Sequence, residues 1–197
     1  MNRPLIDKDL VIEYISKLDA LFDKPGEIMF TGETTHVVEG WRRWSTHIEF
    51  ASSVSKNDRS YFNECIVRVA SEMHIAVTDE FPGTVVPLPS GYEERSREPG
   101  PSFDSLQLKV KHFDPYSIVY RYMARGLEHD YQMALSFLEN GWVEVAEMDR
   151  RLEDLIEKFN FQTIQQDPAE FRRRYNGLNQ MWNSTNNAGK THRATPI

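Results

Sequence analysis

Cysteine is almost absent from this chain, and long apolar runs are missing altogether. The single cysteine among 197 residues, Cys65, excludes a disulfide scaffold and a zinc site built from several cysteines. No apolar stretch approaches the ~18 residues that a membrane-spanning helix needs, and the first residues lack the apolar core of a signal peptide. We therefore expect a protein with no membrane contact in a reducing compartment, most simply the cytoplasm.

Basic residues are also in deficit, 23 against 30 acidic ones, which gives a net charge of −7. Residues 161–197 hold five basic and two acidic residues, a net of +3, so the first 160 residues carry −10. An acidic body repels phosphate, which argues against broad nucleic-acid binding. The basic run Arg172, Arg173 and Arg174 is a candidate contact for an acidic protein partner or for the acidic body of the chain itself, and a solvated tail is the alternative.

The order of predicted elements indicates an α+β fold with a helical C-terminal region. Apolar residues at three- and four-residue spacing predict helices, and polar–apolar alternation predicts strands. We expect helices at 7–22 and 58–73, strands at 27–31, 47–51, 75–78 and 106–110, a helical or looped stretch before residue 47, an irregular proline-rich stretch at 81–101, and helices between 114 and 159. Asn140-Gly141 would separate two of the last helices. Cys65 falls on the inward side of its helix, which favours a core thiol, and Arg125 and Asp130 are expected to form an internal ion pair. A domain at 1–113 would then be followed by a helical cap packed on it at 114–160 and a polar tail at 161–197, with a helix at about 167–182 and disorder beyond.

Several short segments in the first 160 residues resemble the nucleotidyltransferase superfamily. The sequence FTG at 30–32 resembles its strand and first glycine, and RWSTHIEF at 43–50 resembles its strand with paired acids. PLPSGYEER at 87–95 and the helical segments around 114–117 and 124–130 resemble a poorly characterised bacterial branch, related to minimal nucleotidyltransferases and abortive-infection toxins. The resemblance covers roughly residues 8–158, and the order of the segments is more specific than any one of them.

The resemblance implies a mixed sheet with flanking helices and a metal-dependent transfer of a nucleotidyl group. Two carboxylates one residue apart on a strand share a face and hold Mg²⁺, and a third acid comes from a neighbouring strand. Glycines before a short helix let the backbone approach phosphates. On this basis Gly32, Glu33, Arg43 and Arg95 are candidate nucleotide-binding residues, with a structural ion pair as the alternative for Arg95.

The chain departs from the family pattern at the positions that would hold the metal. His47 and Glu49 occupy the places of the paired acids, Ala76 aligns with the third acid, and Glu33 replaces the second small residue of the glycine turn. An imidazole is a poor ligand for Mg²⁺. We therefore expect no cofactor; Mg²⁺ or Mn²⁺ at His47 and Glu49 belongs to the alternative of an altered but active site, in which Asp79 or Glu80 could replace Ala76.

Three functional hypotheses follow. The first is a degenerate, non-catalytic binding or regulatory subunit of a toxin–antitoxin, defence or mobile-element system, with a protein partner and with a nucleotide as a further candidate ligand. The second is an active nucleotidyltransferase that acts on a protein or RNA through an altered site, and the third is a plain α+β interaction protein. Trp41 and Trp44, which flank two arginines, are candidate contacts for a protein partner. Aromatic residues next to basic ones can also stack on nucleic-acid bases, or the segment can be a loop covered by the rest of the protein.

Overall fold

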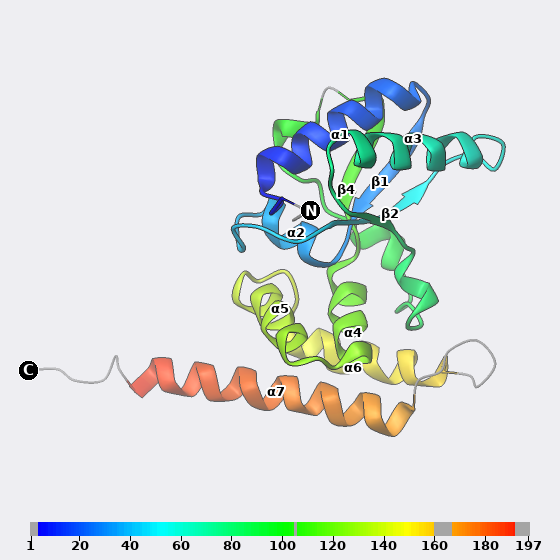
Figure 1. The fold of residues 1–197 in the computed structure, drawn as a ribbon. Helices are drawn as coiled ribbons and strands as arrows, with labels where there is room; N and C mark the ends of the chain where they lie inside the picture. Colours follow the sequence, from blue (N-terminus) through cyan, green and yellow to red (C-terminus); the bar gives the residue numbers. More distant parts are fainter. Residues whose placement is uncertain (1–3, 105, 160–166, 192–197) are drawn as a thin grey trace, which may run out of the picture. The chain divides into compact units, whose positions relative to one another are not determined.

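The computed structural model describes residues 4–104, 106–159 and 167–191, and they form two compact units. The first unit contains the chain up to Pro82 together with Glu93–Asp114, and the second contains Gly83–Tyr92 and the chain from Pro115 onward. The proline-rich loop at 83–92 therefore groups with the C-terminal helices. Figure 1 shows the fold of each unit.

Helix α1, Lys8–Phe22, opens the first unit. Asp7 precedes it as the N-cap, and its carboxylate accepts a hydrogen bond of 3.0 Å from the backbone N–H of Leu10. The buried face repeats at three- and four-residue spacing, and the helix ends at Asp23 in the left-handed conformation. The predicted helix at 7–22 is thus confirmed to within one residue.

A four-stranded mixed sheet carries the rest of this unit, in the order β3-β2-β1-β4. Strand β1 (Gly26–Phe30) pairs antiparallel with β2 (Ile48–Ser53) and parallel with β4 (Leu108–His112). Strand β3 (Val77–Asp79) pairs parallel with β2. Helices and sheet together confirm the α+β class.

Strand alternation divides the sheet into two faces. Ile28 and Phe30 of β1, and Ile48 and Phe50 of β2, join the apolar core under α1 and α3 (Arg59–Glu72), which lie side by side in Figure 1. Glu49 comes between two of these core residues and therefore lies on the opposite face. Cys65 is buried on the inner side of α3, where burial raises its pKa, as expected for a core thiol rather than a nucleophile.

Several boundaries differ from the sequence prediction. His47 precedes β2 instead of beginning it, and β3 and β4 each start two residues later than expected. A short helix, α2 (Gly32–Val38), fills the stretch that the sequence left as helix or loop. The proline-rich segment contains three single 3₁₀ turns, Pro82–Thr84, Tyr92–Arg95 and Pro101–Phe103.

The second unit is helical: α4 (Pro115–Arg125), α5 (Glu128–Glu139), α6 (Val145–Glu157) and α7 (Pro168–Thr191). Asn140 and Gly141 separate α5 from α6 as predicted. Helix α7 packs against α4 and α5 (Figure 1), and the Tyr175 hydroxyl donates to Asp149 Oδ1 of α6 at 2.6 Å. Within the described residues, no helix has the length and apolar character needed to cross a membrane.

The predicted disorder after residue 182 is wrong for the segment up to Thr191, which continues α7. The hydroxyls of Ser184 and Thr185 donate to the carbonyls of Gln180 and Met181, four residues earlier. These bonds let the polar side chains be satisfied inside a helix, where they would otherwise favour a turn. Residues 192–197 of the predicted tail lie outside the described residues.

Candidate functional site

The candidate site lies where β1 runs into α2, opposite the start of β2. Strand β1 ends at Phe30, and Thr31 leads to Gly32, whose φ is +53°. The next residue, Glu33, donates its backbone N–H to Oε2 of Glu49 at 2.9 Å. The place where the family resemblance implies a phosphate is therefore filled by a carboxylate of the protein itself.

Glu49 is held from three directions. Its Oε1 lies 3.3 Å from His47 Nε2, and its Oε2 accepts the bond from the Glu33 backbone. Its own backbone N–H donates to the Thr34 hydroxyl at 2.7 Å. The residue is only 6% exposed, so this carboxylate has protein partners on both oxygens and little access to solvent.

The contact between Gly32 and Glu49 leaves no room for a side chain. A Cβ added at Gly32 would lie 1.8 Å from Glu49 Oε2, and the positive φ is itself unfavourable for any residue with a side chain. The positive φ and the nearby Glu49 carboxylate both favour glycine here, whereas the resemblance attributes the glycine to a bound phosphate.

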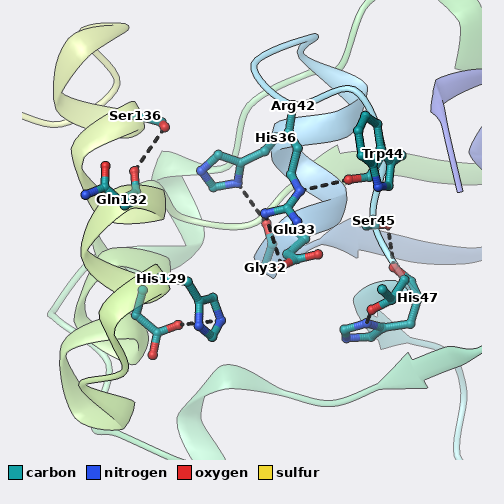
Figure 2. Close-up of polar contacts among 12 residues, drawn as sticks. Gly32, Glu33, His36, Arg42, Trp44, Ser45, His47, His129, Gln132 and Ser136 are labelled. Atoms are coloured by element: carbon teal, nitrogen blue, oxygen red, sulfur yellow. Dashed lines mark hydrogen bonds and ion pairs between the residues drawn. The ribbon is translucent and has the colours of Figure 1, made fainter. Parts of the chain in front are cut away.

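Glu33 has a cationic neighbour that the sequence analysis did not single out. Arg42 Nη1 lies 3.3 Å from Glu33 Oε1, and its Nε donates to the backbone carbonyl of Trp44 at 2.8 Å (Figure 2). Arg43, the adjacent arginine, is the one that the family resemblance placed at this site. Only the path of the loop decides between two neighbouring arginines, and no sequence signal could have separated them.

The register between β2 and β3 shows where Ala76, the residue aligned with the third acid of the family, lies relative to His47 and Glu49. Glu49 of β2 is opposite Thr78 of β3, so His47 lies beside Ala76, as the sequence alignment of these positions supposed. Asp79 pairs with Phe50 and belongs to the other face, where its carboxylate bonds to Ser52 and Arg59. Asp79 therefore does not replace Ala76.

These residues do not fit the metal site that the resemblance implies. Ala76 offers no ligand atom, His47 offers an imidazole that faces Glu49, and both oxygens of Glu49 already have partners. Within the described ranges, no group of three or more His, Cys, Asp or Glu side chains is placed to share an ion.

The remaining predicted site residues of the first unit make contacts with residues other than Glu49. Trp41 packs edge-on against the buried imidazole of His36 at 5.4 Å between ring centroids, whereas Arg43 stacks its guanidinium 5.9 Å from the exposed ring of Trp44. Arg95 forms two hydrogen bonds to Asp114, at 2.8 and 2.9 Å. Asp114 is 1% exposed, which favours the structural role for Arg95.

The three arginines of α7 make ion pairs within the second unit. Arg172 forms two bonds of 2.6 Å with Glu153 of α6, while Arg173 and Arg174 both pair with Glu170. Their charges are therefore largely compensated locally. Arg125 and Asp130 form the internal ion pair expected from the sequence, which joins the end of α4 to the first turn of α5.

One partly buried polar pair in the first unit has no signal in the sequence. His112, at the end of β4, is fully buried, and its Nε2 lies 2.8 Å from Glu39 Oε1. The hydrogen bond from His112 lowers the pKa of Glu39. An isolated histidine in an alternating strand carries no signal that it will meet a carboxylate 73 residues away.

Comparison of the chain with protein-family models, with curated proteins and with solved structures finds no match.

Proposed function

We propose that this chain is a non-catalytic protein that acts by binding a protein partner. In this proposal the turn at Gly32 and Glu33, together with His47, Glu49 and Ala76, forms a nucleotidyltransferase-like cradle. The observation that supports this most is the state of Glu49, the one carboxylate at the place of the paired acids. Its two oxygens are engaged by the Glu33 backbone and by His47. A transferring site needs carboxylate oxygens that are free to clamp cations.

The neighbouring residues support the same proposal. Ala76, in register beside His47, has no donor atom for a cation. Glu33 brings a negative charge to the turn where a triphosphate would approach, and Arg42 is already paired with it. A binding or regulatory subunit of a defence or toxin–antitoxin system, as the resemblance implies, would need neither a cation nor a triphosphate at this place.

A transfer assay tests the proposal directly. The full chain is incubated with each labelled nucleoside triphosphate and Mg²⁺ or Mn²⁺, alone and with a protein or tRNA acceptor. We expect no label on any acceptor. Transfer that disappears in Glu49→Gln and persists in Glu64→Gln, a substitution on the exposed side of α3, would overturn the proposal.

Restoring the missing acids tests the cradle itself. His47→Asp combined with Ala76→Asp would place two new carboxylates near Glu49, at the residues just before β2 and β3. We expect this double variant to bind Mn²⁺ more tightly than the unmodified chain, as measured by the loss of the free-ion signal in electron paramagnetic resonance. Asn63→Asp with Ser71→Asp, both on the exposed side of α3, is the charge-matched control. Equal binding by the two double variants would argue against a cradle at this position.

A further inference from the structure

Two extended segments of the first unit lie side by side and present an apolar surface. Ile6 and Ser45 exchange backbone hydrogen bonds of 2.9 and 2.8 Å. Because side chains alternate along an extended chain, Ile6 and Ser45 both point inward and are fully buried. Their neighbours Leu5 and Trp44 face outward and are 56% and 42% exposed.

A hollow adjoins this surface. It has a volume of about 360 Å³ and is lined by Pro4, Leu5, Thr46, His47, Ala76 and Thr78. Its apolar lining comes from the N-terminal segment and Ala76, while two hydroxyls and an imidazole supply polar groups. A volume of this order lies at the lower end of ligand-binding cavities, which run from about 300 to 1,000 Å³. It can take an apolar side chain but not a folded element.

A cation without an ion pair borders the same surface. Arg43 is exposed and stacks on Trp44, and it forms no ion pair with any residue that the structure describes. Arg42 and Arg59 of the same unit, in contrast, pair with Glu33 and Asp79. Tryptophan and arginine are the residues most enriched at the energetic centres of protein interfaces.

We propose that the surface formed by Leu5, Arg43, Trp44 and the hollow beside them docks a peptide segment of a partner protein that carries one carboxylate next to an apolar side chain. The proposal rests on the proposed function, because it identifies the partner chemistry of a protein that acts by binding. The apolar side chain enters the hollow between Leu5 and Ala76, and the carboxylate pairs with Arg43. The first 160 residues carry a net charge of −10. Further carboxylates would be disfavoured by this charge, so the one carboxylate of the segment is the one that pairs with Arg43.

The test uses defined peptides and the full chain. The probe is the acetylated, amidated peptide Gly-Ser-Phe-Leu-Asp-Gly-Ser, titrated into the ¹⁵N-labelled protein and followed by amide chemical shifts. We expect shifts confined to the residues of this surface, and weaker binding by at least about tenfold in Leu5→Ser and in Arg43→Glu, equivalent to about 1.4 kcal/mol. Val67→Ser and Arg68→Glu, at exposed positions of α3, are the matched controls and should bind as the unmodified chain does.

Charge reversal separates docking from a general loss of structure. A second peptide with Lys in place of Asp should bind poorly to the unmodified chain and better to Arg43→Glu. Amide shifts that are absent up to the solubility limit, or that are unchanged in Leu5→Ser and Arg43→Glu, would overturn the proposal. Light scattering that shows a dimer which Leu5→Ser converts to a monomer would also overturn it, because a second copy would then be the occupant.

The outcome of this test is distinguishable from that of the proposed function. Peptide binding together with nucleotidyl transfer would refute only the non-catalytic assignment. An absence of both would refute the docking surface and leave the non-catalytic assignment standing.

Discussion

Gly32 and Glu49 are in such close contact that a Cβ on Gly32 would meet the Glu49 carboxylate at 1.8 Å. The contact joins the turn before α2 to the face of β2 that lies away from α1 and α3. It means that the conformation of the turn and the position of the Glu49 carboxylate are determined together. The first prediction follows from this dependence.

Substitution Gly32→Ala should lower the free energy of unfolding by about 2–4 kcal/mol, from the positive φ and from the clash with Glu49 together. Gly40→Ala is the control, because Gly40 has φ +75° but no atom within 4 Å of an added Cβ, so it carries the backbone cost alone, about 1–2 kcal/mol. Chemical denaturation of both variants provides the measurement.

The same pair can be examined by a double-mutant cycle. In the Glu49→Ala background, Gly32→Ala should cost at least about 1 kcal/mol less than in the unmodified chain, because the clashing carboxylate is gone. Additive effects would show that the carboxylate does not occupy this position in solution.

Arg95→Ala should destabilise the protein by about 3 kcal/mol, because it leaves the carboxylate of Asp114 buried without its bidentate partner. The side chain of Asp114 is fully inaccessible to solvent. Arg173→Ala removes an ion pair whose arginine is 77% exposed, and should change stability by no more than about 0.5 kcal/mol. Thermal and urea unfolding of both variants would check this, and equal losses would contradict a structural role for Arg95.

Tyr14→Phe should leave stability unchanged or slightly improved. The Tyr14 hydroxyl is buried in the core and has no hydrogen-bond partner among the described residues, and burial raises its pKa. Removal of a buried polar group without a partner costs nothing in hydrogen bonding. Tyr120→Phe is the matched control, since the Tyr120 hydroxyl donates to the Met148 carbonyl at 2.7 Å, and its removal should cost about 1–2 kcal/mol. A comparable loss in Tyr14→Phe would reveal a partner for this hydroxyl.

The bond between His112 and Glu39 should make stability depend on pH in the acid range. Because the pKa of Glu39 is lowered from 4.5 in the folded protein, its contribution is present above that value and is lost as pH falls through the lowered pKa. Glu39→Gln should therefore reduce the unfolding free energy at neutral pH by about 1 kcal/mol and have a smaller effect near pH 3. Urea denaturation at both pH values measures the difference, with Glu64→Gln as the exposed control, and a difference independent of pH would contradict the assignment.

Local sequence patterns predicted most of the elements of the fold. Asp7 and the apolar spacing after it predicted α1 to within one residue, and Asn140-Gly141 predicted the break between α5 and α6. These signals work because capping and helical periodicity involve residues only three or four positions apart. The C-terminal end of α7 was missed because the composition after residue 182 is typical of disorder, while the hydroxyl-to-carbonyl bonds that accompany the helix are not visible in composition.

The order of the sequence segments suggested that the glycine turn would lie beside the segment with His47 and Glu49. The two segments do meet, through the bond from the Glu33 backbone to Glu49. That the Glu33 backbone would bond to Glu49 could not be foreseen, because the contact depends on where the short helix α2 begins relative to β2.

The sequence by itself determined the α+β class, most helix and strand positions and the core placement of Cys65, because each of these follows from residue type or from near neighbours. Tertiary structure alone decided that Arg42 rather than Arg43 pairs with Glu33, that Arg95 pairs with Asp114, and that the Glu49 carboxylate accepts a bond from the Glu33 backbone. Those choices depend on ångström distances between side chains far apart along the chain. Such distances are determined only when the strands pair in one register and the loops between them take one path.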